Sequence, residues 1–245
     1  MKALAKRILA GLGISVRRVP PGIVVGYDLD RDLSLVIGPH PGSVCVDVGA
    51  HEGLFVDLLL ANLNHPTIHA FEPAPGPFAR LKSRHGATPG VTLVNAGLGR
   101  EPGAIEFNIY DNQTLNSFLP MLPAGASTLG GPKLVETRSV PVFSLDSYAA
   151  SSGLAHISLL KIDTQGYELQ VLQGAERTLS EGNVGTVLVE INFAPLYDRQ
   201  VWAHEIIGFL HDRGLHLVDF YEKCRLNPHL GWCTALFTRR APSPS

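Results

Sequence analysis

The sequence predicts an α/β fold: a mostly parallel seven-stranded sheet with helices on both faces and an antiparallel hairpin at its C-terminal end. Three observations support this prediction. Apolar segments of strand length alternate with amphipathic segments of helical period from residue 43 to residue 213, as in strands joined by helical crossovers. Residues 44–48 are almost continuously apolar, as in a parallel strand buried on both faces. The last two apolar segments are separated only by residues 222–231, and a parallel crossover needs about a dozen residues or more.

The chain begins with an amphipathic basic segment. Residues 1–19 place lysine and arginine against leucine and isoleucine at helical spacing, which predicts a helix. Two interpretations stay open. The helix either touches a membrane surface or a partner weakly, or packs across the domain or at a dimer contact, which its short length and modest charge favour. Residues 22–38 follow as a lead-in, with a strand expected at residues 23–27.

The remaining elements follow in chain order. Their patterns predict strands at residues 43–49, 67–72, 91–95, 157–163, 186–191, 215–221 and 232–238, and helices at residues 52–63, 76–84, 167–179 and 200–213. Residues 104–110 and 134–140 predict a hairpin-like pair around a connection rich in proline, glycine and serine. No linker divides the sheet, so we expect a helix and lead-in over residues 1–40, one domain over residues 41–240 and a frayed tail over residues 241–245.

Composition limits the classes of function. The 245 residues carry a net charge of −2 and a pI near 6.5, which gives no field to gather nucleic acid. The three cysteines include no Cys-x-x-Cys pair, and Cys45 falls in a core strand, which indicates a reducing compartment. We find no cleavable signal and no apolar run of about 18 residues. These features predict a cytoplasmic protein with no nucleic-acid partner and no transmembrane segment.

A glycine-rich turn follows the first strand of the sheet. Asp-Val-Gly-Ala-His-Glu-Gly over residues 47–53 ends the strand and opens a helix. Gly49 and Gly53 allow a sharp turn and let a ligand approach the backbone, and the first helical turn directs free N–H groups at that ligand. Asp47 lies inside the strand end, where it can accept hydrogen bonds. The arrangement predicts a site for a nucleoside cofactor.

The residues of this turn favour a cationic cofactor over a dinucleotide. A dinucleotide fingerprint has a middle glycine that seats a pyrophosphate, whereas here Ala50 and His51 follow the first glycine and an acid, Glu52, lies at the helix start. S-adenosylmethionine carries an ammonium and a sulfonium and no phosphate. Glu72, at the end of the second strand, can accept both ribose hydroxyls. The alternative is a helix-capping Asp47 and a solvated Glu72.

The third strand completes the predicted cofactor site. It is followed by Asn95-Ala-Gly, where an adenine can lie against the chain and the Asn95 carboxamide can hydrogen-bond its edge; a plain strand-to-turn junction is the alternative. The cofactor-binding residues that we predict are Asp47, Gly49, Ala50, His51, Glu52, Gly53, Glu72, Pro73, Asn95 and Ala96.

A second motif joins the fourth strand to its helix. Lys-Ile-Asp-Thr-Gln-Gly-Tyr-Glu-Leu over residues 161–169 places Asp163 at the carboxyl end of the strand and Gly166 in the turn. Together with the glycine-rich turn and Phe-Glu-Pro at residues 71–73, it resembles the FkbM family of S-adenosylmethionine-dependent methyltransferases. The resemblance spans residues 32–238.

The resemblance implies a class I methyltransferase, Rossmann-like sheet, and an O-methyltransferase that acts on a hydroxylated small molecule such as a sugar, a polyketide or another secondary metabolite. The chain departs from the family at two positions. Many relatives have asparagine where His51 stands and an acid where Gln165 stands, so the role of that acid does not carry over.

Methyl transfer to a hydroxyl asks little of a protein. An in-line approach of the acceptor oxygen supplies much of the acceleration, and the hydroxyl needs a proton acceptor or a cation. The candidate catalytic residues are Asp163, His51 and Glu190, with Asp163 first, as a base or as a ligand of Mg²⁺; its alternative role is to position the cofactor or to cap the following helix. The ten histidines show no close metal-ligand spacing, so we assign no metal site.

A polar loop beyond residue 110 is the expected rim for the acceptor. From it we predict Asn112, Asn116 and Ser117 as substrate-binding residues, together with Gln165. Residues 119–132 then form a long connection rich in proline and glycine, which we interpret as a lid that excludes water. Two other functions stay open: a binding module that keeps the cofactor pocket without turnover, and a nicotinamide-dependent oxidoreductase, which the turn and the terminal strand pair disfavour.

Overall fold

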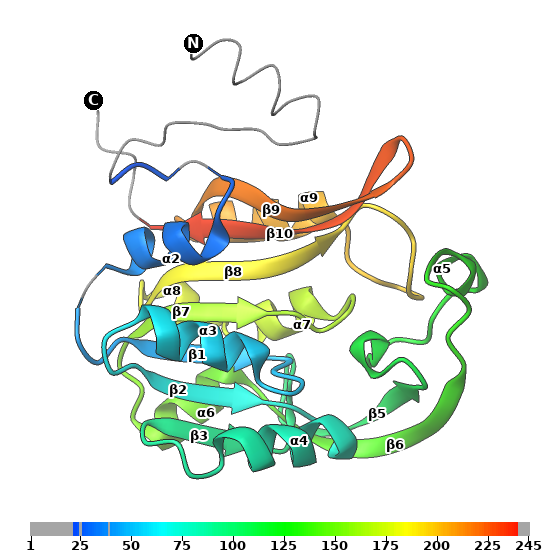
Figure 1. Cartoon of the computed structure of the whole chain (residues 1–245), viewed down its shortest axis with the longest axis horizontal. Coiled ribbons are helices and arrows are strands. Elements are labelled where there is room, and N and C mark those ends of the chain that lie inside the picture. The colour runs from blue at the N-terminus through cyan, green and yellow to red at the C-terminus, as the bar shows by residue number, and fades with distance from the viewer. Residues whose placement is uncertain (1–21, 25, 39, 240–245) are drawn as a thin grey trace, which may run out of the picture.

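The computed structural model describes residues 22–24, 26–38 and 40–239. Its centre is a seven-stranded sheet in the order β3-β2-β1-β7-β8-β10-β9 (Figure 1). The strands are β1 (Val44–Val48), β2 (Thr67–Phe71), β3 (Val91–Val94), β7 (Ile157–Ile162), β8 (Val184–Asn192), β9 (His216–Leu226) and β10 (His229–Thr238). The first five run parallel, and β10 is antiparallel to both β8 and β9. The predicted fold class and its antiparallel C-terminal pair are confirmed.

Helices cover both faces of this sheet through two separate cores. The helices of one core are α6 (Leu145–Ser152), α7 (Glu168–Gln173), α8 (Glu176–Ser180) and α9 (Ala203–His211). Those of the other are α2 (Leu29–Ile37), α3 (Leu54–Asn62) and α4 (Pro75–His85). Neighbouring strand residues point to opposite faces, so Val46 and Leu160 lie in the first core and Cys45 and Leu159 in the second. This explains why the strands are apolar along their whole length.

A smaller sheet projects beyond the carboxyl ends of the parallel strands (Figure 1). It has the order β4-β6-β5 and consists of β4 (Gly97–Leu98), β5 (Gly103–Tyr110) and β6 (Leu134–Phe143). The hairpin-like pair predicted here is confirmed. Between β5 and β6 lie a 3-10 turn, η1 (Gln113–Leu115), and a short helix, α5 (Pro123–Thr128), so the expected lid is partly helical.

The lead-in differs from its prediction. The described residues of the segment 23–27 form no strand, and α2 follows them at once. The buried carboxylate of Asp32 accepts hydrogen bonds from the Gly26 N–H and from the Tyr221 hydroxyl of β9, each at 3.0 Å. The strand prediction was wrong because this carboxylate, on a helix that the sequence analysis missed, fixes the segment against a strand far along the chain.

The helix predicted over residues 167–179 is broken into α7 and α8 at Gly174. A Cβ atom on Gly174 would lie 1.9 Å from the carbonyl oxygen of Gly99, so the helix ends where two backbones touch. Helix α6 had no predicted counterpart. In the part of the chain that the structure describes, no helix is long and apolar enough to cross a membrane. The helix predicted within residues 1–19 and the tail after residue 240 lie outside the described residues.

Candidate active site

Two clefts open at the carboxyl edge of the parallel strands. The first encloses about 760 Å³ between the turn after β1, the end of β2, β4 and η1. The second encloses about 860 Å³ between α3, the end of β7, β8 and β10. Gly49, His51 and Asp163 line both clefts. The edge where sequence motifs predicted a site is therefore hollow on both sides of one shared wall.

Glu72 is the most strongly constrained acid of the first cleft. Its side chain leaves the end of β2 and is buried. One carboxylate oxygen accepts the His51 N–H at 2.9 Å and the other accepts the Ala74 N–H at 2.8 Å. Each oxygen keeps a lone pair for a further donor. Burial raises the pKa of Glu72 to about 7, although the two backbone donors and Lys161 oppose the shift.

The turn after β1 is compressed against the end of β7. Gly49 has a φ of 80°, and a Cβ atom there would lie 1.9 Å from the carbonyl oxygen of Asp163. His51 also has a positive φ, 49°, and its Nε2 is buried without a hydrogen-bond partner among the described residues. Burial lowers the pKa of this imidazole, so the ring that lines both clefts is neutral.

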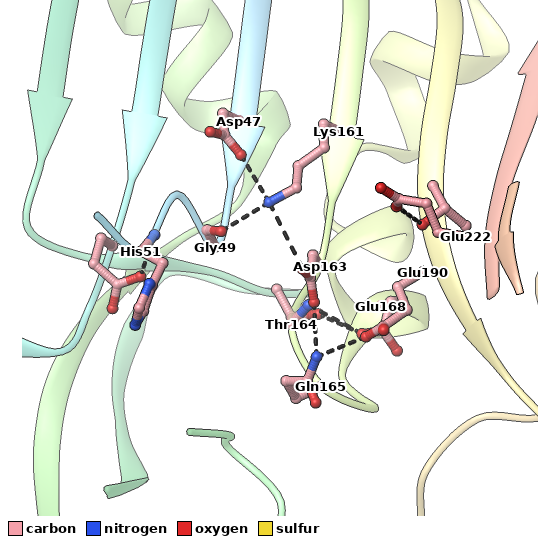
Figure 2. A network of polar contacts seen from close by, with 12 residues as sticks. Asp47, Gly49, His51, Lys161, Asp163, Thr164, Gln165, Glu168, Glu190 and Glu222 are labelled. Atoms are coloured by element: carbon pink, nitrogen blue, oxygen red, sulfur yellow. Dashed lines mark hydrogen bonds and ion pairs between the residues drawn. The ribbon is translucent and has the colours of Figure 1, made fainter. Parts of the chain in front are cut away.

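Asp47 and Lys161 form a buried ion pair beneath the turn. The Lys161 ammonium lies 2.9 Å from Asp47 Oδ1 and donates to the Gly49 carbonyl oxygen at 2.8 Å (Figure 2). Burial disfavours the ammonium, but the neighbouring Asp47 and Asp163 outweigh it and raise the pKa of Lys161. Asp47 therefore holds the turn through Lys161, and it lines neither of the two clefts.

Gln165 joins the two predicted catalytic acids. Its Nε2 donates to Asp163 Oδ1 at 2.8 Å and to Glu190 Oε2 at 2.6 Å (Figure 2). Its Oε1 lies 3.1 Å from the Tyr197 hydroxyl. Burial and the nearby carboxylates of Asp163 and Glu168 raise the pKa of Glu190 well above its ordinary value. The side chain of Asp163 remains 41% exposed, so this acid of the pair can meet a substrate.

Glu168 holds the loop between β7 and α7, which carries Asp163 and Gln165. Its buried Oε1 accepts hydrogen bonds from the Thr164 N–H, the Thr164 hydroxyl and the Gly166 N–H, at 3.0, 3.2 and 3.0 Å. Burial raises the pKa of Glu168 to about 7. Its function is therefore to shape the turn between β7 and α7, whose residues Asp163 and Gln165 face the clefts.

The structure separates the predicted site residues into three groups. Gly49, His51, Glu72, Pro73, Asn116, Asp163 and Gln165 line the first cleft. Ala50, Glu52 and Glu190, together with the three shared residues, line the second. Asp47, Gly53, Asn95, Ala96, Asn112 and Ser117 line neither of these two.

Several members of the last group support the clefts from outside. Asn95 donates through Nδ2 to the Glu72 carbonyl oxygen at 2.8 Å. This is the side-chain amide that was predicted to hydrogen-bond the adenine edge. Ser117 donates to the Gln165 carbonyl oxygen at 2.8 Å. Asn112 caps η1 by accepting from the Thr114 N–H at 3.3 Å.

Sequence reasoning placed the adenine against residues 95–97, which include Gly97, but it missed Leu98, Phe118, Glu222 and Thr234 as lining residues. Gly97, Leu98 and Phe118 form the apolar end of the first cleft, and a Cβ atom on Gly97 would lie 2.5 Å from the Phe118 ring. Thr234 of β10 and Glu222 of β9 line the second cleft. No local pattern pointed to them, because they reach the site only through strand pairing at the far end of the sheet.

The arrangement suits a nucleoside without phosphates. The first cleft offers an apolar slot beside Gly97, a buried acid with free lone pairs at Glu72 and an exposed acid at Asp163. Among the described residues, no group of three or more histidine, cysteine or acidic side chains is placed to hold a metal ion.

Comparison with known proteins gives a consistent result. Residues 47–217 match the family model described as the methyltransferase FkbM domain. The chain is 37% identical over 162 residues to the 31-O-demethyl-FK506 methyltransferase FkbM of Streptomyces tacrolimicus, which covers 56% of this chain and 61% of that protein. It is 25% identical over 189 residues to the 2-O-methyltransferase NoeI of Sinorhizobium fredii, covering 73% of this chain and 74% of that protein. It is 29% identical over 150 residues to the hexuronic acid methyltransferase AglP of Haloferax volcanii, and this match covers 60% of this chain and 54% of that protein. The match to the first of these spans about three fifths of that protein's length.

Proposed function

This chain belongs to the FkbM methyltransferase family, and from that premise we propose that it transfers a methyl group from S-adenosylmethionine to a hydroxyl oxygen of a small acceptor. Glu72 carries the proposal, because its buried carboxylate faces the first cleft with one free lone pair on each oxygen. Two ribose hydroxyls match that acceptor pair. The three relatives described above are named as methyltransferases, one of them as a 2-O-methyltransferase and one as acting on a hexuronic acid.

The residues that would hold the cofactor follow from the lining of the first cleft. Glu72 would take the ribose, and Gly97, Leu98 and Phe118 would contact the adenine. The exposed carboxylate of Asp163 would face the cationic end. When bound, S-adenosylmethionine supplies a methyl group on a sulfonium, which an oxygen nucleophile displaces with release of the neutral sulfide.

Asp163 is the proposed proton acceptor. The Asp163 carboxylate would take the proton of the acceptor hydroxyl as its oxygen accepts the methyl group and the sulfide leaves. The Gln165 amide donates to this carboxylate at 2.8 Å and also to Glu190 at 2.6 Å, whose pKa is raised by burial and by the neighbouring carboxylates of Asp163 and Glu168. His51 is the alternative acceptor, since its lowered pKa keeps the ring neutral.

In the proposed mechanism Asp163, whose carboxylate accepts a hydrogen bond from Gln165, acts as a base and Mg²⁺ takes no part. Dialysis against EDTA is expected to leave kcat unchanged. If dialysis abolishes activity and added Mg²⁺ restores it, the acceptor hydroxyl is activated by a metal ion and Asp163 is not its base.

The decisive experiment is titration calorimetry with S-adenosylmethionine, S-adenosylhomocysteine and NAD, followed by a screen of hydroxylated acceptors with a radiolabelled methyl donor. We expect binding of the first two ligands and none of NAD. Binding of NAD alone would overturn the proposal in favour of an oxidoreductase. Binding without turnover on any acceptor would leave the second candidate, a binding module with the same pocket.

A further inference from the structure

The second cleft has no ligand in the function proposed so far. It shares Gly49, His51 and Asp163 with the first cleft, so a molecule in it would meet the cofactor only at that wall. The proposed proton acceptor lies there. An acceptor hydroxyl that enters from the second cleft therefore reaches the methyl group and Asp163 together.

One side of the second cleft is apolar. Leu29 of α2, Leu54, Phe55 and Leu58 of α3 and Leu188 of β8 line it. Leu54 is 68% exposed, and an apolar ligand that lies in the cleft can cover this side chain together with its apolar neighbours. The acceptor is therefore expected to have an apolar face of its own.

The rest of the lining is polar and contains more acidic than basic residues. Glu52, Asp163, Glu190 and Glu222 belong to it, Glu52 is paired with Arg80 at 2.5 Å, and the cation among the described lining residues is Lys161. Lys161 is already held by Asp47 at 2.9 Å. An anionic group would thus meet carboxylates without a free cation, which costs binding free energy, whereas hydroxyls and amines can donate to those carboxylates.

We propose that the second cleft is the acceptor site and that it selects neutral or amine-bearing hydroxylated compounds with an apolar face over compounds with a carboxylate or phosphate. This inference rests on the proposed function. The proposed preference for uncharged or amine-bearing acceptors differs from the name of one relative, a hexuronic acid methyltransferase, because a hexuronic acid carries a carboxylate.

The position of the site is tested by filling each cleft. Thr234→Trp fills the second cleft, and Thr114→Trp, its matched control, fills the first. In calorimetry, Thr234→Trp is expected to leave the Kd for S-adenosylmethionine within about twofold, while Thr114→Trp raises it roughly tenfold or more. Loss of cofactor binding in folded Thr234→Trp would overturn the inference and leave the proposed function standing. Absence of binding in the wild type would contradict the proposed function instead.

The chemical class is tested with three probes on the protein saturated with S-adenosylhomocysteine: p-nitrophenyl glucoside, the corresponding 2-amino sugar and p-nitrophenyl glucuronide. The neutral and amino probes are expected to bind roughly tenfold more tightly than the glucuronide, the size of one carboxylate repulsion at this range. Glu222→Gln should reduce the difference in Kd between the glucuronide and the other two probes. Equal or tighter binding of the glucuronide, or no binding of any probe, would overturn the proposed class.

A different observation points to a partner surface. Residues 134–141 of β6 pair with β5 on one side, whereas β4 covers only Val142 and Phe143 on the other. Among the described residues the outer edge of β6 therefore has no strand partner, and Figure 1 shows this strand along the outside of the smaller sheet. Residues 134–139 are all exposed, and Leu134 and Val135 are 55% and 66% exposed. An exposed strand edge without a partner strand is a template for pairing.

The sequence of this edge is complementary to itself. Glu136 and Arg138 flank Thr137. In an antiparallel pairing of two copies centred on Thr137, Glu136 of each copy lies opposite Arg138 of the other, and opposite charges on facing residues stabilise such a pair. We further propose that two copies of this chain dimerise along β6, which would join the two small sheets into one.

Charge exchange tests the dimer. In sedimentation velocity, the wild type is expected to be dimeric at micromolar concentration. Glu136→Arg and Arg138→Glu should each be monomeric and the double exchange dimeric again. Glu106→Arg, the same change on exposed Glu106 of β5, is the control and should stay dimeric. A monomeric wild type, or single variants that remain dimeric, would overturn this proposal.

Discussion

At the scale of single residues, burial tunes the acids of the site in different ways. Glu72 and Glu168 are both buried and both have a pKa raised to about 7. Glu168 accepts hydrogen bonds from its own loop, whereas Glu72 keeps lone pairs for a ligand. The difference follows from position. Glu72 lies at a strand end that opens on the cleft, and Glu168 lies in the first turn of a helix beneath it.

The pKa of Glu72 predicts a pH-dependent affinity. Ribose hydroxyls donate to the ionised carboxylate, so cofactor binding releases a proton from protonated Glu72 when the pH is below about 7. The affinity for S-adenosylmethionine should therefore rise roughly tenfold from about pH 6 to about pH 8. Calorimetry at the two pH values measures this rise, and Glu72→Gln should be weak and pH-independent. A wild type with the same affinity at both values would remove the carboxylate from the ribose site.

Asp163 is predicted to affect turnover more than binding. Asp163→Asn keeps the shape and the acceptor oxygen near Gln165 but cannot take a proton, so kcat should fall by roughly 10²-fold or more, as for the loss of a general base. The KM for the acceptor should change far less. His51→Gln is the matched comparison: if it, and not Asp163→Asn, abolishes turnover in a folded protein, the imidazole is the base.

At the scale of elements, the glycine-rich turn depends on contact between two strand ends. Gly49 combines a left-handed φ with a Cβ position 1.9 Å from the Asp163 carbonyl oxygen, so Gly49→Ala must move either the turn or the end of β7. We expect the free energy of unfolding to fall by about 2 kcal/mol or more, measured by urea denaturation. Gly103→Ala is the control, since nothing lies within 4 Å of a Cβ atom there. Equal stability of the two variants would show that the contact is relaxed in solution.

The attachment of α2 to β9 can be tested in the same way. Tyr221→Phe removes the hydroxyl that donates to buried Asp32 and leaves a carboxylate that is less well satisfied. The free energy of unfolding should fall by about 1–3 kcal/mol, the cost of such a loss. No loss of stability in Tyr221→Phe would mean that other contacts hold α2.

At the scale of the whole molecule, the buried acids couple stability to pH. The folded pKa of Glu168 is about 7 and its ordinary value is 4.5, so the folded state binds its proton more tightly than the unfolded state. This contribution is fully present below about pH 4.5 and is lost as the pH rises through about 7. From about pH 5 to about pH 8 the wild type should therefore lose on the order of 2 kcal/mol more unfolding free energy than Glu168→Gln. Urea denaturation across this range measures the difference; parallel pH profiles for the two proteins would show that Glu168 does not titrate within it.

The sequence predicted some features better than others for a physical reason. Periodicity gave the seven strands of the main sheet and the acids at their ends, because burial on two faces imposes an apolar pattern on each strand separately. It failed at residues 23–27 and at the break between α7 and α8. Contacts between distant segments decide both: Asp32 with Tyr221 in one case and Gly174 against Gly99 in the other.

By itself the sequence determined the seven strands of the main sheet, the glycine-rich turn, the acid at residue 72 and the family, since each depends on residues that are neighbours in the chain. Only the tertiary structure decided that Gln165 bridges Asp163 and Glu190, that Lys161 holds Asp47, and that β9 and β10 bring Glu222 and Thr234 to a second cleft. These contacts join side chains across different strands and loops, and chain order does not specify which strand ends meet until the sheet has formed.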